Sequence, residues 1–179
     1  MSRLLGAVLA GGQSRRFGSD KALAELDDRP LIAHAAAALE PYVDTVAICG
    51  RAFAPYLALP DRPAPWLGPL GGLAAALRHA ADNGFDHVLS IGCDVPAIPA
   101  GLVDALVAAG APIAVRALPI CGLWRASDAD RLDRHLATTD HRSVRNWVAA
   151  CSGQWFDGDI PLANINTPDD LAALIARRD

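Results

Sequence analysis

The chain has 179 residues, of which 52% are hydrophobic and 20% charged, and its formal net charge is −4. This length suits one folding unit that buries its own core, so we expect residues 1–179 to form a single domain. The acidic balance argues against a nucleic-acid partner, because proteins that hold DNA or RNA by its phosphates are basic. We also expect a cytoplasmic protein without membrane contact, since no apolar run approaches the roughly 20 residues of a membrane-spanning helix.

Short apolar runs of strand length alternate with alanine-rich stretches of helical spacing, which is typical of βαβ units and a mostly parallel sheet. In chain order, we expect strands at 4–9, 45–49, 87–92, 113–116, 120–124 and 154–156. The expected helices are at 30–39, from 68–72 onward, and at 102–109, 132–136, 144–149 and 169–176. Pro30 suits a first helical turn, and Thr167-Pro168 suits the start of the last helix. Crowded prolines predict a loop over most of 52–67.

The polar loop after the first expected strand has the composition of a polyphosphate-binding loop. Residues 9–21 read LAGGQSRRFGSDK and join adjacent glycines to Arg15, Arg16 and Lys21. Glycines let backbone N–H groups approach an anion, arginines grip phosphate oxygens in pairs, and lysine supplies a compact charge. The alternative is an ordinary turn with surface cations. The patterns G-x-x-x-x-G-K-[ST] and G-x-G-x-x-G are both absent, which disfavours a P-loop NTPase and a dinucleotide dehydrogenase.

Two aspartates are candidates for the same site. Asp94 follows the expected strand at 87–92, and ligands of open α/β sheets bind at the carboxyl ends of strands. Its carboxylate suits Mg²⁺ held against a triphosphate, because Mg²⁺ takes one or two carboxylates together with phosphate oxygens. A turn aspartate ahead of Val95-Pro96 is the alternative. Asp61 lies between prolines and, taken alone, is interpreted as a turn residue.

The four cysteines and five histidines lack the spacing of a zinc site or of a disulfide framework. We therefore expect reduced thiols and no metal bound through imidazole.

Four blocks together resemble the molybdenum cofactor guanylyltransferases, a family of nucleotidyltransferases. They are LAGGxSxRxGxDK at 9–21, GPLGG at 68–72, CDVPAIP at 93–99 and NINTPDDL at 164–171. The first block is shared with the wider superfamily, whereas the last two together narrow the resemblance to the molybdopterin branch. The resemblance spans most of the chain and implies a three-layer Rossmann-like nucleotidyltransferase fold of the α/β class, with a mostly parallel central sheet.

The resemblance also implies site roles. The expected catalytic residues are Lys21, Arg15 and Asp94, with Arg16 beside the phosphates. Asp94 is also the expected ligand of the Mg²⁺ cofactor, and Asn164 and Asn166 are expected to face the pterin. The expected nucleotide-binding residues are Leu9, Ala10, Gly11, Gly12, Lys21, Asp61 and Asp94.

Three positions depart from the family's pattern. Family members often offer an asparagine to the nucleotide after the second strand, where this chain has Cys49-Gly50-Arg51, so no side-chain contact is carried over there. Leu118-Pro119 stands where a His-Pro or Gln-Pro is expected, and Phe17 replaces a more usual methionine.

The implied reaction transfers GMP from GTP to the terminal phosphate of molybdenum-molybdopterin, which gives molybdopterin guanine dinucleotide cofactor and pyrophosphate. The attacking phosphate is already anionic, so we assign no general base and no protein nucleophile, and catalysis rests on positioning and charge stabilisation. Expected partners are GTP and molybdenum-molybdopterin, with molybdenum-insertion proteins and molybdoenzyme chaperones as candidates, and the expected state is a monomer or weak oligomer. The alternatives are CTP on molybdopterin, another nucleotide on a sugar or alditol phosphate, and a non-catalytic nucleotide-binding protein.

Overall fold

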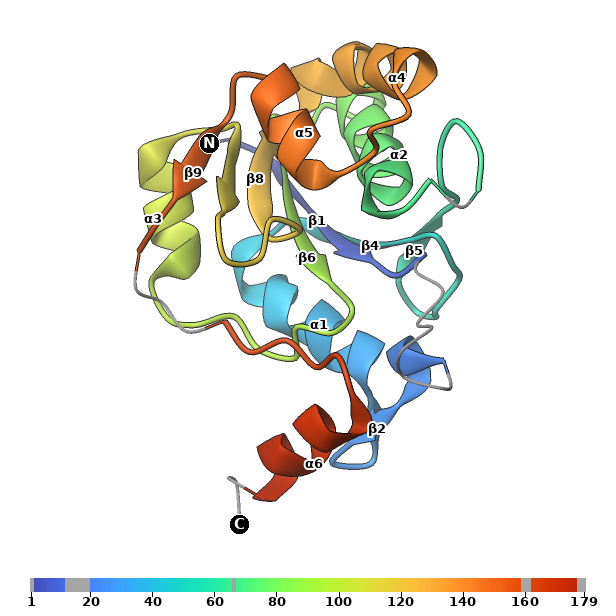
Figure 1. Cartoon of the computed structure of the whole chain (residues 1–179), viewed down its shortest axis with the longest axis vertical. Coiled ribbons are helices and arrows are strands. Elements are labelled where there is room, and N and C mark those ends of the chain that lie inside the picture. The colour runs from blue at the N-terminus through green and yellow to red at the C-terminus, as the bar shows by residue number, and fades with distance from the viewer. Residues whose placement is uncertain (1, 12–19, 66, 159–161, 177–179) are drawn as a thin grey trace.

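A seven-stranded sheet with helices on both faces organises the protein, in a computed structural model that describes residues 2–11, 20–65, 67–158 and 162–176 (Figure 1). The order of the strands across the sheet is β5-β4-β1-β6-β8-β7-β9. Within this sheet β8 is antiparallel to both of its neighbours, and every other pair is parallel. The expected mostly parallel α/β sheet is thus confirmed. The strands are β1 (Leu4–Leu9), β4 (Thr45–Cys49), β5 (Leu57–Leu59), β6 (His87–Gly92), β7 (Ile113–Val115), β8 (Gly122–Arg125) and β9 (Gln154–Phe156).

Helices cover the two faces of this sheet and complete the three expected layers. On one face lie α1 (Leu31–Leu39) and α3 (Leu102–Ala109), and on the other lie α2 (Pro69–Asp82), α4 (Ala129–Thr138) and α5 (Val144–Ala150). The final helix, α6 (Pro168–Ala176), lies beyond the edge of the sheet (Figure 1). Across the described ranges, none of these helices combines the length and the hydropathy needed to cross a bilayer.

The central strands are rich in apolar residues because helices bury both faces of the sheet. In β1, Leu5, Ala7 and Leu9 pack on the side of α2, whereas Val8 packs on the side of α1. A strand buried on both faces needs apolar side chains at every position, so it shows no polar alternation. This is why the sequence alone locates β1, β4 and β6 correctly.

Two short features differ from the expectations. The proline-rich stretch contains the strand β5, which pairs in parallel with β4 through Ala47–Leu57, Ile48–Ala58 and Cys49–Leu59. Pro30 precedes α1 instead of starting it, because it pairs with Glu25 in a small hairpin of β2 (Glu25–Leu26) and β3 (Arg29–Pro30). Strands this short depend on their partner strand more than on their own residue preferences, so local sequence does not reveal them.

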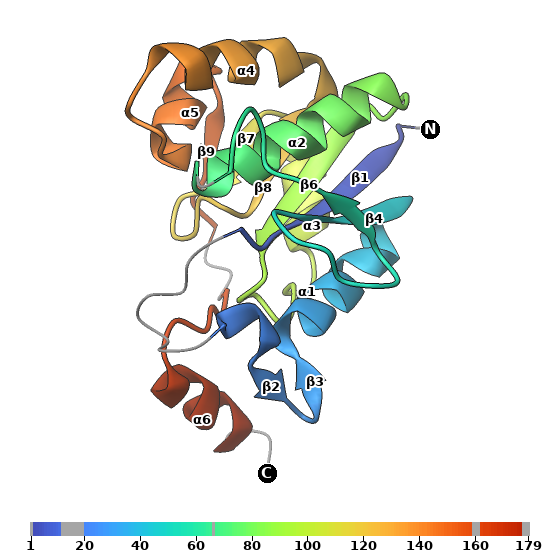
Figure 2. The ribbon, with the colours of Figure 1, turned by 90° about the vertical axis from the view of Figure 1, so that its right-hand side faces the viewer.

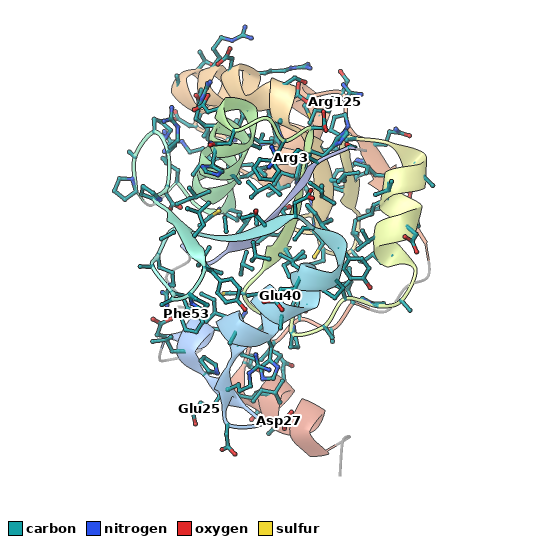
Figure 3. The ribbon with its side chains drawn as sticks, turned by 180° about the vertical axis from the view of Figure 1, so that it is seen from behind. Arg3, Glu25, Asp27, Glu40, Phe53 and Arg125 are labelled. Carbon is teal, nitrogen blue, oxygen red and sulfur yellow. The ribbon has the colours of Figure 1, made fainter. Side chains whose placement is uncertain are left out.

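The β2–β3 hairpin and α6 form a small unit below the sheet (Figure 2). Leu26, Leu31 and Ile165 bury their side chains together between these elements. The helix start expected at Thr167 is confirmed, since Thr167 Oγ1 accepts a hydrogen bond from the backbone N–H of Asp170 at 3.1 Å. Glu25 and Asp27 mark this hairpin at the end of the molecule away from Arg3 and Arg125 (Figure 3).

A buried hydroxyl ties β6 to the antiparallel strand β8 and to the turn before it. Ser90, which is 1% exposed, donates from Oγ to the carbonyl oxygen of Ile120 at 2.7 Å and accepts from Trp124 Nε1 at 2.8 Å. We expect Ser90→Ala to lower the free energy of unfolding by about 1–3 kcal/mol, because it leaves a buried indole N–H without its acceptor. Chemical denaturation measures this loss. Trp124→Phe removes the donor, so Ser90→Ala should cost much less in that background, and equal costs in both backgrounds would contradict the assignment.

Candidate active site

The carboxyl ends of the parallel strands β1, β4 and β6 meet at one edge of the sheet, where they border a pocket of about 190 Å³. Residues far apart in the sequence converge there. Six of the residues expected to bind nucleotide line this pocket, namely Leu9, Ala10, Gly11, Lys21, Asp61 and Asp94. Cys93, Ile120 and the first turn of α2 contribute further to its wall.

Lys21 lies at the centre of the polar part of the pocket. Its ammonium nitrogen is 2.8 Å from Asp94 Oδ2 and donates to Asn166 Oδ1 at 3.0 Å. The side chains of Lys21 and Asp94 are only 12% and 18% exposed, so water screens their charges little. Lys21 is also the only lysine in the sequence. One cation thus links the loop after β1, the end of β6 and the segment before α6.

Asp94 is held by its own backbone as well as by Lys21. The chain turns at the end of β6, where the N–H of Val95 donates to the carbonyl oxygen of Gly92 at 3.2 Å. The carboxylate lies over Gly92 so closely that a Cβ atom there would be 2.2 Å from Asp94 Oδ1. The backbone oxygen of Asp94 accepts a hydrogen bond from Ile165 at 2.9 Å, which fixes the C-terminal segment beside the strand end.

Asp170 explains how the NINTPDDL block supports the pocket. Its Oδ2 accepts hydrogen bonds from the backbone N–H groups of Asn166 and Thr167, both at 2.9 Å. The bonds from Asn166 and Thr167 hold the pKa of the Asp170 carboxyl below its ordinary value. The Asn166 amide is thereby fixed beside Lys21. Asn164 is half-buried on the same segment, and neither it nor Asn166 belongs to the described residues that line the pocket.

Glycines from three elements surround the carboxylate of Asp61. A Cβ atom on Gly11 would lie 2.8 Å from Asp61 Oδ2, and one on Gly50 would lie 2.9 Å from Asp61 Oδ1. Gly71 and Gly72, in the first turn of α2, approach the same side chain, with added Cβ atoms 3.3 Å from Asp61 Cβ and 3.5 Å from Asp61 Oδ1. The turn aspartate of the sequence is therefore a wall of the pocket, and the GPLGG block makes room for it.

Comparison with known proteins shows the family of this chain. Residues 6–154 match the family model described as MobA-like NTP transferase domain. The chain belongs to this family. It is therefore a nucleotidyltransferase, and the resemblance expected from the four sequence blocks is confirmed.

Curated relatives of this MobA-like protein match it over nearly their whole length. A molybdenum cofactor guanylyltransferase of Rhodobacter capsulatus is 39% identical, over 95% of this chain and 94% of its own. The protein of the same name from Acidiphilium cryptum is 34% identical, over 99% of this chain and 96% of its own.

Solved structures show the shared fold. Molybdopterin-guanine dinucleotide biosynthesis protein A from Archaeoglobus fulgidus has a TM-score of 0.74 and 22% identity, and covers 98% of this chain and 100% of its own. The 2-C-methyl-D-erythritol 4-phosphate cytidylyltransferase of Thermus thermophilus has a TM-score of 0.73 and 16% identity, with 99% of both chains covered. Identities this low establish the fold alone. The expected Rossmann-like nucleotidyltransferase fold is thus confirmed.

The polar groups of this MobA-like site fit Mg²⁺ that arrives with a triphosphate. Across the described ranges, no three His, Cys, Asp or Glu side chains cluster closely enough to hold a metal by themselves. The Asp94 carboxylate instead provides one hard oxygen donor, and the Asn166 amide oxygen lies beside the same ammonium group. One carboxylate completed by phosphate oxygens and water is a common Mg²⁺ environment. Gly12, Arg15 and Arg16, the other residues expected in the loop, lie outside the described ranges.

Arg51 lies beside the pocket and is not among the residues expected from the sequence. Its Nε donates to the carbonyl oxygen of Ala10 at 3.2 Å, and its Nη1 lies 2.7 Å from Asp20 Oδ2. No side-chain contact is expected from the resemblance over Cys49-Gly50-Arg51, because the chain departs from the family's pattern there. The sequence feature that could have indicated Arg51 is its position two residues after the end of β4, at the sheet edge where ligands of such folds bind.

Proposed function

We propose that this protein transfers GMP from GTP to the terminal phosphate of molybdenum-molybdopterin and releases pyrophosphate. The supporting observation is the cluster of Lys21, Asp94 and Asn166 beside the glycine-lined carboxylate of Asp61. Through Lys21, this cluster joins the nucleotide-binding edge of the sheet to Asn166 of the NINTPDDL segment. The identities above, with relatives named molybdenum cofactor guanylyltransferase, favour guanine and molybdopterin over other substrates of this fold.

Each group has a role suited to its chemistry. The backbone of Leu9, Ala10 and Gly11 would bind the nucleotide, and Lys21 with Arg15 would neutralise the phosphates. Asp61 would accept hydrogen bonds from the nucleoside, because an ionised carboxylate can only accept. Asp94 would hold Mg²⁺, which supplies positive charge beside the reacting and departing phosphates.

The acceptor would bind on the side of Asn164 and Asn166. Its terminal phosphate oxygen forms a bond to the α-phosphorus of GTP, and the bond from that phosphorus to the pyrophosphate oxygen breaks. Because both partners are anionic, the protein contributes mainly by bringing them together and offsetting their repulsion. No side chain is needed as a nucleophile. Burial raises the pKa of the Cys93 thiol in the pocket wall to about 11, so this thiol stays protonated near neutral pH.

The cellular setting belongs to the same proposal. We place the reaction in the cytoplasm, with molybdenum-insertion proteins and molybdoenzyme chaperones as further candidate partners. The single domain and the monomeric or weakly oligomeric state remain predictions of the sequence.

A thermal-shift comparison of GTP, CTP, ATP and UTP, each with Mg²⁺ and with EDTA, tests the proposal. A ligand at about 100 times its Kd stabilises the native state by about 2.7 kcal/mol, which raises the Tm of a chain of this size by about 5–10 °C. We expect this rise with GTP and a smaller one after EDTA is added. Selectivity for CTP would instead establish the cytidylyl alternative, and no response to any nucleotide would contradict both.

Pyrophosphate release then tests catalysis directly. With GTP and molybdenum cofactor, we expect pyrophosphate to accumulate in step with the dinucleotide product. Nucleotide binding without pyrophosphate under these conditions would support the non-catalytic alternative.

A further inference from the structure

Arg51 joins two segments that carry the active site. Its Nε donates to the carbonyl oxygen of Ala10 at the end of β1, at 3.2 Å, while its Nη1 donates to Asp20 Oδ2 at 2.7 Å. The side chain is 26% exposed, so it lies partly inside the protein surface. Two acceptors on one planar group fix the orientation of the guanidinium. Arg51 therefore holds Asp20 at a defined distance from the strand end.

Asp20 also orients Lys21, because it caps the short helical turn that begins at Lys21. Its second oxygen, Oδ1, accepts a hydrogen bond from the backbone N–H of Ala22 at 3.2 Å and so caps the short 3₁₀ turn η1 (Lys21–Leu23). A carboxylate at this position fixes the start of the turn. Lys21 is its first residue, and its ammonium nitrogen reaches Asp94 Oδ2 at 2.8 Å. A continuous chain of contacts thus runs from Arg51 through Asp20 and η1 to Lys21 and Asp94.

Arg51 and Asp20 lie beside the pocket, although neither lines it. Arg51 bonds to the backbone of Ala10, and Asp20 directly precedes Lys21. Both Ala10 and Lys21 line the pocket.

We propose that Arg51 is a positioning residue for Lys21: it holds the Asp20 carboxylate so that η1 presents the lysine ammonium to Asp94 and to the phosphates. This inference rests on the proposed function, since the position of Lys21 affects a rate only if Lys21 serves the transfer. A role through Asp20 differs from direct phosphate binding, because Nε and Nη1 are already bonded to groups of the protein.

Steady-state kinetics on Arg51→Ala, Asp20→Ala and the double variant test this role. We expect Arg51→Ala to lower kcat about tenfold or more and to leave the KM for GTP within about threefold, since the misplaced group acts mainly in the transition state. The double variant should match Asp20→Ala within about twofold, because both changes break one chain of contacts. Independent, multiplying losses would overturn the proposal. So would a raised KM with unchanged kcat, which would indicate that Arg51 binds the nucleotide itself.

Arg51→Lys and Arg78→Ala serve as matched variants. Lys keeps the positive charge but lacks the fork that reaches both Ala10 O and Asp20, so we expect it to restore only part of kcat. Full restoration by Lys would show that charge alone matters and would overturn the positioning role. Arg78 pairs with Asp130 and Asp133 away from the pocket, so Arg78→Ala loses ion pairs without affecting η1 and should keep kcat. A similar loss of kcat in Arg78→Ala would show that the loss in Arg51→Ala comes from general destabilisation, and this would overturn the positioning role.

A measurement without substrate separates this inference from the proposed function. Lys21 is the only lysine, so the Cε signal of selectively ¹³C-lysine-labelled protein reports this side chain alone. In free Arg51→Ala we expect that signal to lose order relative to wild type, and in Arg78→Ala we expect it unchanged. An unchanged signal in Arg51→Ala would overturn the positioning role even if the wild type is active. A wild type that gives no pyrophosphate would refute the proposed function, while this signal would still report whether Arg51 orders Lys21.

Discussion

Replacing Lys21 with alanine is expected to lower kcat/KM for nucleotidyl transfer by about 10²–10³-fold, the usual cost of removing one preorganised charge or donor. The buried setting makes this cost large, since Lys21 is 12% exposed and lies 2.8 Å from Asp94. The fold should survive, because the elements around the pocket keep their own backbone pairing. We expect Lys21→Ala to stay folded with a Tm lower by about 5–10 °C, because the largely buried Asp94 carboxylate loses its cation.

Lys21→Arg provides the matched control. It retains the charge but replaces a compact ammonium with a broad planar group in a crowded position, so we expect only partial recovery of turnover. The measurement is the initial rate of pyrophosphate release over a range of nucleotide concentrations, which gives both kcat and kcat/KM. A folded Lys21→Ala variant with turnover within threefold of wild type would remove Lys21 from the mechanism.

Gly50→Ala is expected to be the most damaging single-methyl substitution around the pocket. Gly50 has a φ of +88°, and a Cβ atom there would lie 2.5 Å from the Cα and 2.7 Å from the nitrogen of Gly11. A backbone neighbour cannot rotate away as a side chain can, so the end of β1 must shift. We expect a loss of about 2–4 kcal/mol in the free energy of unfolding and a Tm lower by about 5–15 °C.

Gly101→Ala is the matched control for Gly50→Ala. Gly101 has a similar φ of +79°, but apart from its chain neighbours no heavy atom of the described residues lies within 4 Å of its added Cβ. It should cost only the strain of positive φ, about 1 kcal/mol. Nucleotide binding, measured by thermal shift, should weaken in Gly50→Ala and not in Gly101→Ala. If both substitutions lowered stability and nucleotide binding equally, the close approach of Gly50 to Gly11 would not be the cause of the loss in Gly50→Ala.

Much of the secondary structure could be predicted from local sequence. β1, β4 and β6 are mostly apolar because helices cover both faces of the sheet. Proline begins α2 and α6, and the Ser143 side chain caps α5. β5 was missed because it exists through its pairing with β4, while its own residues lie in a proline-rich stretch. The helix expected over 30–39 begins at Leu31 instead of Pro30, since the pairing of Pro30 in the β2–β3 hairpin keeps it out of α1.

In the candidate site, too, some residues are predictable from local sequence and others only from contacts between distant segments. Lys21 and Asp94 carried signals in the sequence, a cationic glycine loop after one strand and an aspartate at the end of another. Asp61 taken alone is interpreted as a turn residue and becomes a candidate only through the family resemblance, because its place in the pocket depends on the approach of Gly11, Gly50, Gly71 and Gly72 in space. No contact is expected for Arg51 from the sequence, because Cys49-Gly50-Arg51 departs from the family's pattern.

By itself, the sequence determined the α/β class, the strand ends that meet at one edge and the family, because these depend on burial patterns and on residues close together in the chain. Only the tertiary structure decided which polar groups meet. Lys21, Asp94 and Asn166 are separated by up to 145 positions and share one ammonium group. Arg51 reaches Asp20 across 31 positions. Such contacts depend on strand order and on the precise path of the loops, and a single sequence does not encode either in any local pattern.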